Sequence, residues 1–254
     1  MAVDKLKLLM GRSITITTEE GSVVVNQPKI SEIVDMGEDA YSKVCLPFLM
    51  TTEAIFGGME NEEELIEEFN IFDLFFVEVK DGIGLLDNIF GGNSLDILTL
   101  ALSYFLDTDN IKILRNRQKI IVDDSYLIDS DEFENLRKVI QDIVGREDVE
   151  IEKPPKNMSK RQKDIWNKLQ KGRKRKAEKE ALYLQDMINY TAFGGEAYIP
   201  LDHIDNMTYY QFQNAYKSVM GKDAFKMGMS YKLSQKFEVK DEIKHWSDSL
   251  KIGK

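Results

Sequence analysis

The sequence predicts an α+β protein that is predominantly helical, with two short β-hairpins and one long basic helical segment. Apolar residues recur at three- and four-residue spacings over most of the chain, which is the period of an amphipathic helix. Two stretches rich in β-branched residues carry turn residues at their centres, as hairpins do. A block of lysine and arginine follows the pair Pro154 and Pro155 and forms the basic segment.

The length and composition allow one large domain or two modest ones. The chain has 254 residues, 43% apolar and 31% charged, which suits a folded protein with a sizeable core. Composition changes most sharply at "VEIEKPPKN", residues 149–157, where two prolines favour extended backbone. We therefore divide the chain into an α+β N-terminal domain at 1–152, a basic arm at 153–176 and a helical C-terminal region at 177–254.

We expect no membrane span and no secretory signal in this sequence. No apolar run approaches the ~18 residues that a membrane span needs. The opening segment "MAVDKLKLLMGRSITITTEEG" contains an apolar run that is too short for the core of a secretory signal. We expect an intracellular protein or one carried in a particle.

The N-terminal elements follow from local pattern. "SITITTEEGSVVVN" predicts a hairpin at 13–26, and a helix follows, with Pro28 in its first turn and a bend near Gly37. The stretch 59–79 is predicted as one helix with an acidic first turn. A buried helix is expected at 94–106, and a second hairpin at 110–128 with "RNRQ" at its turn.

Capping signals mark two further helices. Asp129 and Glu132 have the spacing of a capping box, and Gly145 ends the helix that follows. Thr208 and Gln211 have the same spacing at the start of a C-terminal helix rich in tyrosine and phenylalanine. A short closing helix is expected around Trp246.

No constellation of residues predicts catalysis, a cofactor or a metal. Cys45 is the only cysteine and stands among apolar neighbours, as a small core residue does. His203 and His245 have no partner at zinc-ligand spacing. The pair Gly91 and Gly92 lacks the GK[ST] of a phosphate loop.

Two acidic clusters leave an enzyme as the weakest hypothesis. Asp123 and Asp124 are adjacent in the predicted second hairpin, so their side chains would point to opposite faces. The glutamates of 60–68 lack the Asp/Asn/Gly spacing of a calcium loop, which favours a solvated helix face. We therefore expect no enzyme.

The charge distribution is strongly uneven. The net charge is −10, but residues 153–179 contain twelve Lys/Arg and two Asp/Glu, a local balance of +10. Ser159 is a plausible N-cap, and we expect two helical pieces with a polar joint at 170–176. The mostly lysine charge fits solvation, protein docking or sequence-independent phosphate contact better than base reading.

Exposed charge and aromatic density define the candidate partner-binding residues. The basic segment and the start of the last helix supply them: Lys160, Arg161, Lys163, Trp166, Lys168, Lys171, Arg173, Lys174, Arg175, Lys176, Tyr209, Tyr210 and Phe212. Aromatic residues without interleaved arginine more often pack a core or a protein interface than stack bases.

Four segments in order carry a resemblance to a family. They are "VVVNQPKISEIVDMGEDAY", "DDSYLIDSDEFENLRKVI", "KNMSKRQKDIW" and "DMINYTAF" with "YIPLDHIDNMTYYQFQNAY". Together they resemble the tail assembly chaperones or baseplate-hub assembly proteins of tailed phages and prophages of Gram-positive bacteria. The resemblance spans about two thirds of the chain and implies no catalytic residue. It implies contact with tail-tube, tape-measure or hub proteins.

The leading hypothesis is therefore a non-enzymatic structural or assembly protein of a phage tail. It would act in the host cytoplasm during assembly, with the virion tail as a second location, and homo-oligomers are compatible with this role. The alternative is a nucleic-acid-binding factor that uses the basic segment 156–179.

Overall fold

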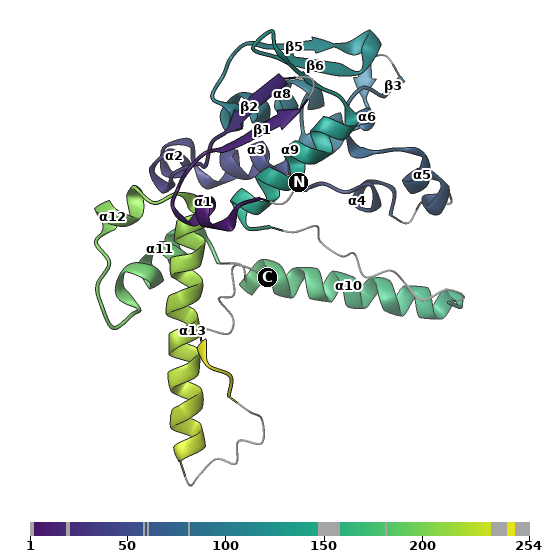
Figure 1. Cartoon of the computed structure of the whole chain (residues 1–254). Helices are drawn as coiled ribbons and strands as arrows, with labels where there is room; N and C mark the ends of the chain where they lie inside the picture. The colour runs from purple at the N-terminus through teal and green to yellow at the C-terminus, as the bar shows by residue number, and fades with distance from the viewer. Residues whose placement is uncertain are drawn as a thin grey trace.

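A computed structural model confirms the predominantly helical α+β fold (Figure 1). It describes residues 3–18, 21–57, 59, 61–80, 82–146, 158–180, 182–234 and 243–246. The predicted boundary at 149–157 and most of the predicted closing helix around Trp246 lie outside these residues. No helix in the described part of the chain is long and apolar enough to cross a membrane.

The first hairpin is confirmed. Strands β1 (Ile14–Thr18) and β2 (Gly21–Val25) pair antiparallel, with Ile14 opposite Val25 and Ile16 opposite Val23. These four side chains are buried and alternate with exposed ones, so one face of the ribbon packs on the body. Helix α1 (Lys5–Leu9) precedes it, and the Asp4 carboxylate caps that helix.

The second hairpin is in fact a three-stranded sheet. Its strands are β5 (Ile111–Leu114), β6 (Lys119–Val122) and β7 (Tyr126–Ile128), with the 3-10 turn η1 (Arg115–Arg117) between the first two. Asp123 and Asp124 have φ values of 51° and 58° and lie in the turn before β7. Placing this pair within a strand was therefore wrong, because Asp tolerates the left-handed conformation that the tight turn needs.

Helices α2 (Ile30–Met36) and α3 (Glu38–Leu49) confirm the predicted bend at Gly37. Gly37 has φ 89°, a conformation that a residue with a Cβ rarely adopts. The helix starts at Ile30, so Pro28 precedes it instead of lying in its first turn. Helix α4 (Thr52–Phe56) follows and is capped by the Thr51 hydroxyl.

The single helix predicted for 59–79 was wrong. The structure has two helices, α5 (Glu62–Glu68) and α6 (Ile71–Leu74), then strand β3 (Glu78–Lys80) paired with β4 (Ile83–Gly84). The chain becomes extended at Phe69, and the Asn70 side chain accepts a hydrogen bond from the amide of Asp73. This local cap starts a new helix that buries Ile71, Phe72 and Leu74 in the core.

Helix α8 (Ser94–Leu106) matches the predicted buried helix, after the short α7 (Asp87–Phe90). Helix α9 (Ser130–Val144) begins where Asp129 accepts from the Glu132 amide at 3.2 Å and ends at Gly145 with φ 62°. The predicted capping box is only half formed, because the Glu132 carboxylate accepts a hydrogen bond from the Tyr126 hydroxyl at 2.8 Å.

The C-terminal half differs from the prediction at one point. Helix α10 (Lys160–Glu180) is continuous, so the expected joint at 170–176 was wrong. Helices α11 (Leu184–Phe193), α12 (Leu201–Asp205) and α13 (Tyr209–Leu233) follow. The Thr208–Gln211 capping box at the start of α13 is confirmed.

One hydrophobic core joins the N-terminal elements to the start of α13. Helix α3 packs on α8 and α9, and Phe48 of α3 lies edge-on to Phe105 of α8 and stacks on Phe133 of α9. The buried cluster also includes Leu184 and Phe212. The division into a domain at 1–152 and a helical region at 177–254 stays a prediction.

Hydrogen bonds attach the C-terminal helices to the body. The amide of Tyr209 donates to the Pro28 carbonyl at 2.7 Å, and the amide of Ile30 donates to the Met207 carbonyl at 2.9 Å. The Gln211 side chain donates to the Leu9 carbonyl at 2.9 Å. Beyond this attachment, α13 extends away from the body (Figure 1).

We predict that Phe105→Ala lowers the free energy of unfolding by about 3–5 kcal/mol, because it opens a cavity beneath Phe48. Leu100→Ala on the same helix is the control, since Leu100 is 59% exposed and its loss should cost less than ~0.5 kcal/mol. Urea denaturation followed by circular dichroism measures both. Equal losses would contradict the placement of α8.

Candidate protein-binding site

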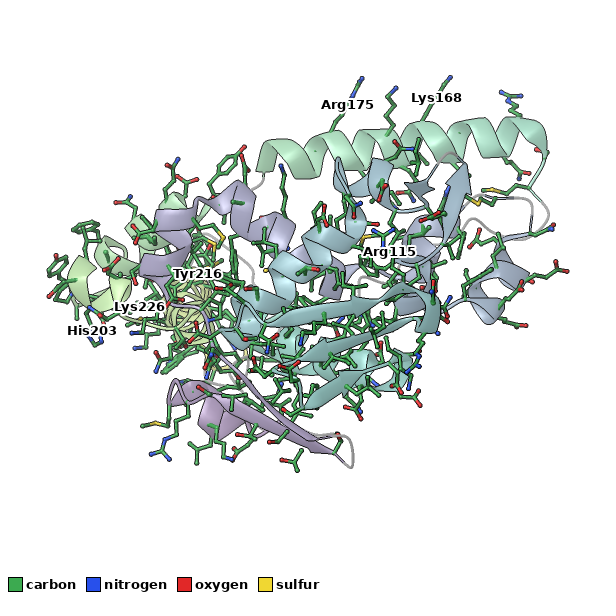
Figure 2. All side chains as sticks on the ribbon, turned by 90° about the horizontal axis from the view of Figure 1, so that it is seen from above. Arg115, Lys168, Arg175, His203, Tyr216 and Lys226 are labelled. Atoms are coloured by element: carbon green, nitrogen blue, oxygen red, sulfur yellow. The ribbon has the colours of Figure 1, made fainter. Side chains whose placement is uncertain are left out.

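Helix α10 presents most of the candidate basic residues to solvent. Lysine, arginine and glutamine are good helix formers, and at the N-terminus the Gln162 side chain accepts from the Ser159 amide at 2.8 Å. Arg161, Lys168 and Arg175 are seven residues apart and so share one face. Figure 2 shows Lys168 and Arg175 directed away from the body.

The other candidate basic residues divide into two groups. Lys171, Arg173 and Lys176 are exposed. The side chains of Lys160, Lys163 and Lys174 lie outside the described part of the structure.

An apolar stripe lies beside the basic face of α10. Ile165 and Leu169 are four residues apart and are 50% and 56% exposed, and Trp166 is partly buried. We define Ile165 and Leu169 as the α10 stripe. Two exposed apolar side chains on neighbouring turns form a narrow ridge on the helix surface.

The three candidate aromatic residues of α13 are not part of an exposed surface. Tyr209, Tyr210 and Phe212 are all more than nine-tenths buried. Tyr209 packs against Tyr41 of α3 with 5.4 Å between ring centroids. Their role in the structure is to anchor the first turn of α13 in the core, because one face of that turn points into the body.

A largely apolar hollow lies between α11 and α13. Its volume is about 680 Å³. Leu182, Phe193 and Met220 in its lining are 59%, 58% and 44% exposed. The lining is completed by Asp186, Asn189, Tyr190, Gly194 and Tyr216. We call this hollow the α11/α13 groove.

Polar contacts hold the groove in shape. The Tyr190 hydroxyl donates to the Asp223 carboxylate at 2.6 Å, and Tyr190 meets Tyr216 edge-on at 5.9 Å. This hydrogen bond is the main reason that the pKa of Tyr190 rises to about 12, since the carboxylate favours the protonated phenol. Lys226 of α13 pairs with Glu196 at 2.5 Å.

Sequence reasoning missed this groove. Tyr216 and Met220 are four residues apart on α13, which is visible in the sequence as an apolar pair. The pattern alone does not distinguish a pair that faces the core from one that faces a groove. Only the path of α11 beside α13 decides it.

The acidic residues considered for catalysis have structural partners. The Asp123 carboxylate accepts from the Thr108 hydroxyl at 2.5 Å, and that of Asp124 accepts from the Asn110 amide at 3.1 Å. The hydrogen bond from Lys112 lowers the pKa of Asp124. The described residues contain no group of three or more His, Cys, Asp or Glu that could hold a metal ion.

Two other features are explained by folding. Asp87 borders a polar pocket of about 290 Å³, and it accepts hydrogen bonds at 2.8 Å from the amides of Ser94 and Gly84. These bonds lower the pKa of Asp87 and fasten the start of α8. Cys45 is buried, as its apolar neighbours indicate, and burial raises its pKa to about 11.

We predict that Asp223→Asn returns the pKa of Tyr190 from about 12 towards ~10, because a neutral amide stabilises the protonated phenol less than a carboxylate does. A pH titration by NMR with ¹³C-labelled tyrosine measures the change. Tyr126, which bonds to Glu132 instead, is the internal reference and should not move. An unchanged Tyr190 would contradict the hydrogen bond.

Comparison with known proteins gives one match, which includes the groove. Residues 174–251 match the model of a family described as the YomV second domain. Neither the search of curated proteins nor the search of solved structures found a match. The matched family is phage-associated, so the match supports a bacteriophage connection for this chain.

Proposed function

We propose that this chain is a non-enzymatic protein of phage tail or baseplate assembly that acts through protein–protein contacts. The phage-associated match and the resemblance of the four sequence segments support the setting. The partners in this proposal are tail-tube, tape-measure or hub proteins. The protein would meet them in the host cytoplasm and could remain with them in the virion tail.

The α11/α13 groove is the observation that carries the proposal. A concave surface that groups apolar side chains with a few polar ones is a common form of binding site. A fully buried Leu, Met or Phe side chain gains ~1.5–3 kcal/mol over an exposed one. Leu182, Phe193 and Met220 are each about half exposed, so a partner would gain about 1 kcal/mol from covering each of them.

We predict that co-expression with the tail-tube, tape-measure and hub proteins yields a complex that survives purification. Met220→Glu should weaken the binding affinity in this complex at least tenfold. A charge placed in an apolar groove must be desolvated when the partner binds. Met229→Glu is the matched control, because nine residues turn it to the opposite side of α13. A chain that stays monomeric and binds none of these proteins would contradict the proposed function.

The solvent-facing basic side chains favour nucleic-acid binding as a second candidate. Lys168 and Arg175 point away from the body (Figure 2), as side chains that contact phosphate would. If the basic segment binds DNA or RNA, affinity should fall steeply with salt. Lys168→Glu with Arg175→Glu should then reduce the slope of log K against log[salt] by about 2. A gel-shift titration at two salt concentrations tests this, and no shift at low salt eliminates the candidate.

A further inference from the structure

Two exposed apolar surfaces on this chain have shapes that suit each other. The α10 stripe is a narrow ridge on a helix, and the α11/α13 groove is a hollow between two helices. A helix that lays an apolar stripe into a hydrophobic groove is a common mode of protein recognition.

The ridge and the groove are separated within one chain. Leu169 lies eleven residues before Glu180, the last residue of α10, which is about 16 Å along the helix axis. Figure 1 shows that α10 extends away from α11 and α13, and that its C-terminal end is the end nearer to them. The groove of one chain is therefore left open by its own stripe.

The charge of α10 is opposite to that of the rest of the chain. Helix α10 contains ten Lys/Arg and three Asp/Glu, a net charge of +7, which leaves −17 for the rest of a chain whose total is −10. Asp186 is the charged residue among the described residues that line the groove. Lys168 and Arg161 flank the stripe on α10, so an inserted helix would bring basic side chains to an acidic body.

We propose that the α11/α13 groove receives helix α10 of a second copy of this chain. Ile165 and Leu169 enter the groove against Phe193 and Met220, and the basic face of α10 lies against the acidic body of the partner copy. This inference rests on the proposed function, because it names a partner for the same α11/α13 groove. It concerns self-association and does not require a tail protein to be present.

The contact joins two different surfaces, the α10 stripe and the α11/α13 groove. Two copies can exchange their α10 helices reciprocally, which closes a two-fold symmetric pair with an isologous interface. If the geometry does not close on two copies, the same contact repeats around a ring or along a fibre. Either way, every chain in the assembly both donates a helix and receives one, except at open ends.

Analytical ultracentrifugation of the full chain over a concentration range tests the proposal. We expect the mean mass of the wild type to rise with concentration. Leu169→Glu and Met220→Glu, one on each surface, should each weaken association at least tenfold. Met229→Glu should associate like the wild type. Leu169 and Met220 are exposed in the monomer, so circular dichroism should show that Leu169→Glu and Met220→Glu keep the fold.

A cross-linking experiment identifies the pair of surfaces. Cys45 is buried, so Leu169→Cys and Met220→Cys each add one accessible thiol. Mixing the two variants under oxidising conditions should give a disulfide-linked dimer, and neither variant alone should give it. A third variant carries both Leu169→Cys and Met220→Cys in one chain. If a cross-link forms only within this chain, and not between the two single variants, the proposal is overturned, because α10 then packs on its own groove.

Two other results would also overturn the proposal. One is a wild type that keeps the mass of a single chain at every concentration at which it stays in solution. The other is association that persists in Met220→Glu. A third result is a monomeric wild type that binds a tail protein, with this binding lost in Met220→Glu. It would show that the tail protein occupies the groove. In that case the proposed function stands and self-association through the groove fails.

Discussion

The pairing of two distant backbone segments decides where the functional surfaces lie. Residues 27–30, between the first hairpin and α2, bond to residues 207–209 at the start of α13, and Lys29 and Thr208 form an antiparallel bridge. The Thr208 hydroxyl also donates to the Gln27 side chain at 3.2 Å in a buried position. Unpaired buried polar groups are costly, so this contact holds α13 in one direction. The groove, the extended part of α13 and the attachment of α11 all depend on that direction.

A second contact of the same kind fixes α11. The Glu38 carboxylate at the start of α3 accepts hydrogen bonds from the Leu184 amide at 3.1 and 3.2 Å. It thereby caps a helix that is 146 residues away in sequence. With α11 and α13 each fastened to the same body, the space between them is a preformed hollow. Preformed sites bind with less loss of conformational entropy than sites that must be ordered on binding.

Helix α10 is built on different physics from the helices of the core. Its residues have high intrinsic helix propensity and many like charges, and most of its described side chains face solvent. Lysine and arginine repel one another along the helix, which a nearby acidic surface relieves. A long basic helix on an otherwise acidic protein therefore suits an acidic partner, including another copy of the chain.

Elements with local signals could be predicted from the amino-acid sequence. These include the 13–26 hairpin, the bend at Gly37, the buried helix at 94–106 and the capping box at Thr208, because turn residues, caps and apolar period act within a few residues. Three predictions were wrong: the single helix at 59–79, the two-stranded hairpin at 110–128, which has a third strand after Asp124, and the joint at 170–176 in the basic helix. The burial of Tyr209, Tyr210 and Phe212 in the core, and the position of Phe193 and Met220 at a groove, depend on how distant elements pack. An apolar period shows that a face avoids water, and the packing of distant elements determines what covers it.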